Sequence, residues 1–115
     1  VVQKAIYPKA MITRHPGIAN VIAAMKDNIS TPLCQEELAK ILGKTPRHLE
    51  RIFKAVMLET PKSYYLGLRL QEARNLLSET MMSILEVAVA TGFNSRSSFS
   101  KAYKSRFKVS PSSLR

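Results

Sequence analysis

One short pattern of residues occurs twice in this chain of 115 residues, and the repeat constrains the fold more than any other feature. Glu-Leu-Ala at 37–39 recurs as Glu-Val-Ala at 86–88, which is 49 positions later, and Gly43 recurs at the same spacing as Gly92. A small alanine lets two helices approach closely, and glycine adopts the backbone conformation that a sharp turn requires. Each copy is therefore predicted to fold as a short helix, a tight turn and a second helix that crosses the first.

The sequence after each turn also repeats, now 50 positions apart, and it predicts the second helix of each copy. In the first copy Thr45 is a typical N-cap and Pro46 is a typical first helical residue. In the second copy the cap is Asn94 or Ser95. Apolar residues at helical spacing follow both starts and are predicted to face the core. They are Leu49, Ile52, Phe53 and Val56 in the first copy, and Phe99, Ala102, Tyr103 and Phe107 in the second.

The remaining segments also show helical periodicity, and no segment shows a convincing β-strand pattern. An apolar stripe from Ile18 to Ile29 predicts one helix before the repeat. Thr60 and Pro61 begin a longer helix that runs to about Ser78 and links the two copies. We therefore predict an all-α fold of about six or seven helices, in which two helix-turn-helix units are joined by a long linker helix.

These patterns also suggest how the chain is organised. Residues 1–14 carry no helical period, so we interpret them as a linker or arm. Residues 15–115 are predicted to form one domain. Within it we expect the first helix-turn-helix unit at about 34–56, the linker helix at about 61–78 and the second unit at about 83–107.

The strongest compositional signal is the charge. The chain has 18 Lys and Arg against 8 Asp and Glu, which gives a net charge of +10 and a pI near 10.1. From Lys44 onward there are 13 basic and 5 acidic residues. Such an excess attracts polyanions and indicates nucleic acid, although the charge alone is equally compatible with an ordinary solvated surface.

The outer faces of the two second helices carry polar residues at helical spacing, and these are our candidate DNA-binding residues. Arginine can bond guanine O6 and N7 together, and serine and glutamate can also bond base edges. Arg47 and Arg51 are the first candidates for base contacts, and Lys54 and Lys104 for phosphate contacts. Two interpretations of Glu50 stay open, a bond from a cytosine amine and an ion pair with Lys54 in the same helix. The full set is Arg47, Glu50, Arg51 and Lys54 in the first copy, and Arg96, Ser97, Ser100, Lys101 and Lys104 in the second.

Three further polar residues lie near these faces in the sequence. His48 is interpreted as a residue of the helix start that lies near a phosphate. For Arg69 and Arg74, on the linker helix, a phosphate contact and a solvated surface charge both stay open.

The chain resembles the DNA-binding domain of the AraC/XylS family of bacterial transcription regulators. The resemblance covers about Leu33 to Arg115. It implies sequence-specific binding of double-stranded DNA, with the two recognition helices in successive major-groove segments. At about 1.5 Å per residue the linker helix is roughly 27 Å long, near the roughly 34 Å between such segments. The segments that carry the resemblance are Pro-Arg-His-Leu-Glu-Arg-Ile-Phe-Lys at 46–54, Leu-Arg-Leu-Gln-Glu-Ala-Arg at 68–74, and Gly-Phe-Asn-Ser at 92–95 through Phe-Lys-Val-Ser-Pro at 107–111.

The resemblance also implies partners outside this sequence. The stretch at 64–70 resembles the branch of the family whose upstream domain is similar to class I glutamine amidotransferases. The chain begins with Val1 rather than methionine, and we expect an upstream domain that binds the effector. RNA polymerase is a further partner that the resemblance suggests. A cytoplasmic location is expected, because the single cysteine, Cys34, cannot form an internal disulfide.

Four positions depart from the family pattern, and the first is Lys44, which replaces an apolar turn residue whose counterpart is Phe93. Cys34 stands where a serine N-cap is common, so its capping box with Glu37 should be weaker than the one that Ser83 forms with Glu86. Leu58 and Lys108 stand where relatives usually end each recognition helix with glycine. The backbone geometry of both helix ends is therefore open to question.

Other functions find less support in the sequence. Cys34, His15 and His48 lie far apart, and no carboxylate pair, phosphate loop or metal-ligand cluster is evident, so we predict no enzyme, no cofactor and no metal. The longest apolar run, 21–25, is too short for a membrane span. The alternative is a helical module that binds nucleic acid non-specifically or binds RNA. Such a module would need exposed aromatic platforms, and the helical spacing assigns these rings to the core.

Overall fold

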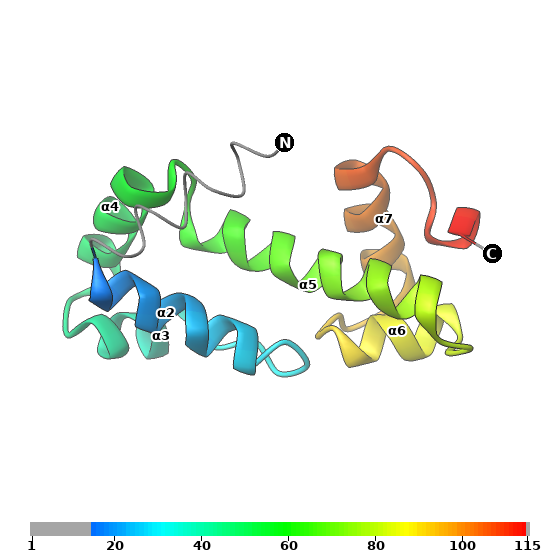
Figure 1. Ribbon diagram of the computed structural model, residues 1–115, viewed down its shortest axis with the longest axis horizontal. Coiled ribbons are helices and arrows are strands. Elements are labelled where there is room, and N and C mark those ends of the chain that lie inside the picture. The colour runs from blue at the N-terminus through cyan, green and yellow to red at the C-terminus, as the bar shows by residue number, and fades with distance from the viewer. Residues whose placement is uncertain (1–14, 115) are drawn as a thin grey trace. The chain divides into compact units, whose positions relative to one another are not determined.

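The computed structural model describes residues 15–114, and every regular element in that range is a helix (Figure 1). The arm predicted for residues 1–14 lies outside the described residues. The all-α prediction is confirmed for residues 15–114. The elements are α2 (Pro16–Asp27), α3 (Gln35–Leu42), α4 (Pro46–Met57), α5 (Pro61–Glu79), α6 (Ile84–Ala90), α7 (Arg96–Phe107) and a short 3-10 helix, η1 (Pro111–Leu114).

The chain divides into two compact units, each of which contains one of the two predicted helix-turn-helix pairs. Among the described residues, the first unit comprises 15–28 and 33–65, and the second comprises 29–32 and 66–114. The helix pair is α3 with α4 in the first unit and α6 with α7 in the second. Helix α5 begins in the first unit and continues in the second, as the predicted linker helix should.

Helices α2, α3 and α4 lie beside the start of α5 (Figure 1), and their buried apolar side chains form the core of the first unit. Val21, Met25, Leu49 and Phe53 are fully buried. Each such side chain contributes about 1.5–3 kcal/mol relative to an exposed position. Because Leu49 and Phe53 occupy one side of α4, the opposite side of that helix is left to solvent.

The core of the second unit is a separate cluster. Helix α5 contributes Leu70, Ala73 and Leu77 to it, and Val87, Ala88, Phe99 and Tyr103 come from α6 and α7. Four aromatic rings continue through this core, with centroids 5.3 Å apart for Phe93 and Phe99, 5.7 Å for Phe99 and Tyr103, and 4.6 Å for Tyr103 and Phe107. Burial raises the pKa of the Tyr103 hydroxyl. These rings therefore stabilise the fold and do not form an exposed platform.

The turn inside each helix pair is built alike. Gly43 has φ 75° and Gly92 has φ 85°, both in the left-handed region that favours glycine. In each turn the N–H after the glycine donates to the carbonyl of the repeated alanine, Lys44 to Ala39 and Phe93 to Ala88. The paired glycines were predicted from the repeat, and the backbone explains why both copies need them.

Helix α2 is shorter than its apolar stripe predicts. It ends at Asp27, and the side chain of Asn28 donates to the carbonyl of Ala24 at 2.8 Å. Ile29 therefore lies beyond the helix. The hydroxyl of Tyr65 donates to the carbonyl of Asn28 and accepts a bond of 3.0 Å from the N–H of Leu33. These bonds compete with continuation of the helix, and the apolar period alone could not reveal them.

Candidate nucleic-acid interface

Helix α4 begins as the sequence predicts. The hydroxyl of Thr45 accepts a bond of 3.2 Å from the N–H of His48, and Pro46 is the first helical residue. A side-chain cap satisfies one of the N–H groups that a helix start leaves without a partner. The cap fixes where the helix begins, and it therefore fixes which residues face away from the core.

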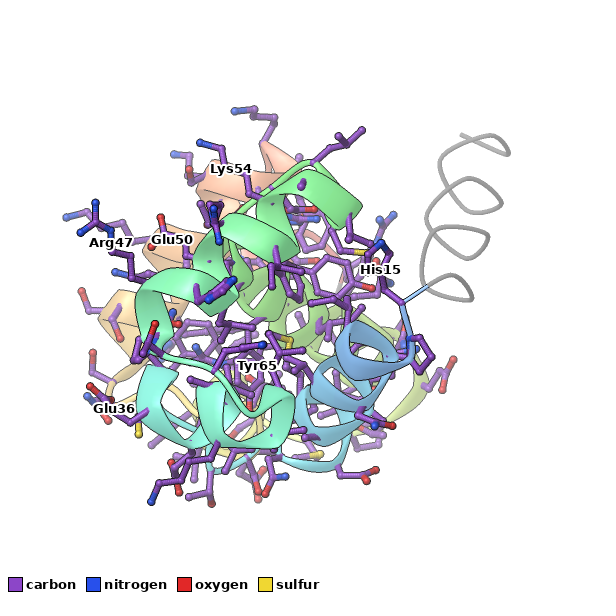
Figure 2. All side chains as sticks on the ribbon, turned by 90° about the vertical axis from the view of Figure 1, so that its left-hand side faces the viewer. His15, Glu36, Arg47, Glu50, Lys54 and Tyr65 are labelled. Atoms are coloured by element: carbon purple, nitrogen blue, oxygen red, sulfur yellow. The ribbon has the colours of Figure 1, made fainter. Side chains whose placement is uncertain are left out.

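The outer face of α4 carries all four candidate residues of the first unit. Arg47, Glu50, Arg51 and Lys54 are exposed, whereas Leu49 on the opposite face is fully buried. Figure 2 shows the labelled side chains of Arg47, Glu50 and Lys54 extending outward from the helix. The structure thus brings these residues together on one accessible surface.

Arg51 has a defined partner on this face. Its Nη2 donates to Nε2 of His48 at 2.8 Å, one helical turn earlier. His48 is only partly exposed. The sequence interpretation placed His48 near a phosphate and gave it no link to Arg51, although the spacing of three residues along a helix is compatible with such a pair.

Helix α7 presents the second set of candidates. Ser95 is the N-cap, and its hydroxyl accepts a bond of 3.1 Å from the N–H of Ser98. The buried rings of Phe99 and Tyr103 hold the inner side of the helix in the core. The outer side carries four exposed residues and one that is partly exposed. The exposed ones are Arg96, Ser97, Lys101 and Lys104, and the partly exposed one is Ser100.

Arg69 has a structural position that the sequence did not predict. Its Nε donates to the carbonyl of Thr91 and its Nη2 to that of Gly92, both at 2.8 Å. The guanidinium also lies over the ring of Phe93, 4.3 Å from the centroid. Arg69 therefore joins α5 to the turn of the second helix pair and is not a solvated surface charge. Arg74, in contrast, is exposed, and its guanidinium lies 5.1 Å from the centroid of Phe107.

A capping box begins both α3 and α6, with a thiol at the N-cap of the first and a hydroxyl at that of the second. At α6 the hydroxyl of Ser83 accepts a bond of 3.0 Å from the N–H of Glu86, and the carboxylate of Glu86 accepts a bond of 2.8 Å from the N–H of Ser83. At α3 the carboxylate of Glu37 accepts from the N–H of Cys34 at 2.9 Å. That bond holds the pKa of Glu37 below its usual range. At this position the exposed thiol of Cys34 stands in place of a hydroxyl, and its sulfur is a weaker hydrogen-bond acceptor than a hydroxyl oxygen.

Both recognition helices end in a left-handed residue even though neither residue is glycine. Leu58 has φ 64° and Lys108 has φ 67°, and the N–H of each donates to the lysine carbonyl four residues earlier. Leu58 and Lys108 therefore keep the helix-ending backbone geometry that is typical of glycine. A side chain in this region costs roughly 1–2 kcal/mol.

Residues 15–114 contain neither a group of metal-ligating side chains nor a candidate membrane span. No group of three His, Cys, Asp or Glu residues in that range lies close enough together to hold a metal ion. Among the described helices, none combines the length and the apolar character that a membrane span requires.

Comparison with known proteins agrees with this geometry. Residues 38–115 match the family model described as a helix-turn-helix domain. The chain is 45% identical over 92% of its length to the HTH-type transcriptional regulator CdhR of Pseudomonas aeruginosa, and it spans only 33% of that protein.

Solved structures show the same architecture. A transcriptional regulator with an AraC-type DNA-binding domain from Chromobacterium violaceum has a TM-score of 0.85 and 37% identity, with 90% of this chain and 92% of that one covered. The DNA-binding domain of AdpA, solved in complex with a target DNA, shares the fold with a TM-score of 0.78 at 24% identity, covering 83% and 86%. The chain belongs to the AraC family of helix-turn-helix DNA-binding domains.

Proposed function

We propose that this chain binds double-stranded DNA at specific sequences and thereby regulates transcription, with α4 and α7 in successive major-groove segments. The observation that carries the proposal is that each unit presents a recognition helix whose inner side is held in a core and whose outer side is polar and accessible. The helix-turn-helix places such a helix in the major groove.

The contact roles follow from the chemistry of the exposed groups. Arg47 and Arg51 are proposed to read guanines, because a guanidinium bonds O6 and N7 together. Lys54 and Lys104 are proposed to contact phosphates, which position the protein without reading sequence. The remaining candidate contacts are Glu50, Arg96, Ser97, Ser100 and Lys101.

The spacing of the two helices along one chain supports a bipartite site. Helix α5 has 19 residues, which span about 28 Å at 1.5 Å per residue. Adjacent major-groove segments on one side of a duplex are about 34 Å apart. A single chain with this linker would read two half-elements without needing a two-fold symmetric operator.

Parts of the whole protein outside this sequence are also proposed. The chain spans about a third of CdhR, so we propose that it is joined to an upstream effector-binding domain, of the amidotransferase-like kind, in a cytoplasmic regulator. Contact with RNA polymerase belongs to the same proposal.

The decisive experiment is selection of bound sequences from a random pool of duplex DNA, with the 115-residue chain at physiological salt. Two enriched half-elements about one helical turn apart are the expected result. Footprinting of the selected site should protect two major-groove segments. Protection of a single segment would contradict the two-helix arrangement.

A competition assay separates the alternative function. Binding of the selected duplex should persist in excess single-stranded RNA and should be reduced by excess unlabelled duplex of the same sequence. Equal competition by RNA and by a random duplex would favour the non-specific or RNA-binding module, despite the burial of the aromatic rings.

A further inference from the structure

The recognition face of α4 contains one side-chain hydrogen bond that the proposed contacts do not explain. Nη2 of Arg51 lies 2.8 Å from Nε2 of His48. An arginine guanidinium has only donors, so Nε2 of the imidazole must be the acceptor. The neutral ring then carries its proton on Nδ1, and the bond requires that tautomer.

This bond sets the direction of the Arg51 side chain. His48 is the third residue of α4, and its own N–H is held by the cap hydroxyl of Thr45 at 3.2 Å. The imidazole therefore projects from the capped first turn of the helix. Arg51 is held toward the helix start, which is the part of a recognition helix that contacts base edges.

Holding Arg51 in this way leaves its reading capacity intact. A guanidinium has five N–H donors, and the bond to His48 uses one of them. The other donors remain available for two parallel bonds to a guanine. A long flexible side chain loses conformational freedom when it binds, and prior ordering reduces that loss.

The second unit has no equivalent pair. At the matching positions Ser98 and Lys101 replace His48 and Arg51. The hydroxyl of Ser98 is directed back to the cap, where it lies 3.1 Å from the hydroxyl of Ser95. The orienting contact is thus a property of the first recognition helix.

We propose that His48 is a positioning residue that determines specificity through Arg51: it orients the guanidinium for guanine and does not itself read the DNA. This inference rests on the proposed function, because it concerns the same recognition face. It predicts that the effect of changing His48 depends on the presence of Arg51.

Two amide substitutions provide a matched test in the 115-residue chain. The amide oxygen of glutamine is as many bonds from Cβ as Nε2 of histidine, whereas that of asparagine is one bond closer. His48→Gln should therefore keep the bond, and His48→Asn should lose it. The measurement is the ratio of affinities for the selected duplex and for a scrambled duplex, made for each variant and for each combined with Arg51→Ala.

We expect His48→Asn to lower this ratio by roughly 3- to 10-fold, the range of a contact between neighbouring side chains, and His48→Gln to keep it near the original value. In the Arg51→Ala background neither substitution should change the ratio further. An unchanged ratio for His48→Asn, or an equal fall in the Arg51→Ala background, overturns the inference. A lack of preference for any duplex in the unmodified chain overturns the proposed function instead.

A second measurement does not depend on DNA. The nitrogen-15 NMR spectrum of the unmodified chain should show the neutral form of the His48 ring as the Nδ1–H tautomer. Arg51→Ala should shift the ring toward the other tautomer. Predominance of Nε2–H in the unmodified chain overturns the inference even where the chain binds DNA specifically.

Discussion

At the scale of single residues, the two turn glycines show that equivalent sequence positions need not be equally sensitive. Both have positive φ, but their surroundings differ. A Cβ on Gly43 would meet nothing within 4 Å, whereas one on Gly92 would lie 2.8 Å from the carbonyl oxygen of Ile29 and from the ring of Pro32. The repeat predicts both glycines, but only the structure distinguishes them.

We therefore expect different costs for the two alanine substitutions. Gly43→Ala should lower the free energy of unfolding by about 1 kcal/mol, the cost of the left-handed backbone alone. Gly92→Ala should lower it by more than about 2 kcal/mol, because backbone atoms must also move. Urea denaturation checks both values. Equal costs at the two positions would contradict the argument.

The leucine at the end of α4 gives a prediction of opposite sign. Leu58 is 69% exposed, so its side chain contributes little burial while its backbone bears the cost of positive φ. Leu58→Gly should raise the free energy of unfolding by about 0.5–1 kcal/mol. The control is Ala55→Gly, an exposed position inside the same helix, which should lower it by about 1 kcal/mol. Destabilisation by Leu58→Gly would show that the exposed leucine makes a stabilising contribution larger than the strain.

At the scale of helices, the start of α3 depends on a carboxylate. The bond from Cys34 to Glu37 lowers the pKa of Glu37 in the folded chain relative to the unfolded one. A lowered pKa contributes stability above the unfolded-state value, and that contribution is lost as the pH falls through the folded-state value. The helix start should thus weaken in acid.

The test compares Glu37→Gln with the unmodified chain as a function of pH. The substitution should destabilise the chain at about pH 7, and the difference should shrink as the pH falls below about 4. Glu36→Gln, which removes the same charge one residue earlier but keeps the cap bond, is the control. Thermal unfolding across the pH range gives the comparison. A difference that does not depend on pH would argue against the carboxylate bond as its source.

The contact between α5 and the second helix pair gives another prediction at this scale. Arg69→Met removes two bonds to the carbonyls of Thr91 and Gly92, as well as the contact with Phe93. Hydrogen bonds from charged donors contribute about 1.5–3 kcal/mol each, and because Arg69 is only partly buried we expect a loss at the low end for two bonds, about 3 kcal/mol. Arg74→Met is the matched control and should cost less than about 1 kcal/mol. Similar values for the two variants in urea denaturation would refute the role assigned to Arg69.

The sequence predicted the helices better than it predicted the contacts between them. Residues such as Leu49, Phe53 and Tyr103 were assigned to the core because a helical period places them on one face, and they are buried. Arg69 was not assigned, because its partners are backbone carbonyls 22 and 23 residues away. A side chain that bonds to distant backbone leaves no pattern in the sequence.

The candidate site shows the same division. The exposure of Arg47, Arg51 and Lys101 followed from the burial of their helical neighbours. The bond from Arg51 to His48 was not foreseen, because spacing shows that two side chains are within reach but does not show that they bond. The contacts to individual bases stay predictions.

At the scale of the whole molecule, the net charge of +10 makes a quantitative prediction about binding. Neutralisation of about five to eight phosphates should give a plot of log affinity against log salt with a slope of roughly −4 to −7. Lys104→Ala should weaken binding to all duplexes and flatten the slope by about one unit, whereas Arg51→Ala should mainly reduce the preference for the selected site. Titrations at several salt concentrations, with selected and scrambled duplexes, measure both quantities. Equal effects of Arg51→Ala on the two duplexes would remove it from the base-reading set.

The separation of core and outer face in α4 and α7 has a practical consequence. The side chains that maintain each unit are buried, and most of the candidate contact residues are in solvent. Exposed positions away from caps and turns tolerate replacement within about 0.5 kcal/mol. A library randomised at Arg47, Glu50, Ser97 and Lys101 should therefore remain largely folded, which makes this small chain a suitable scaffold for selecting new operator preferences.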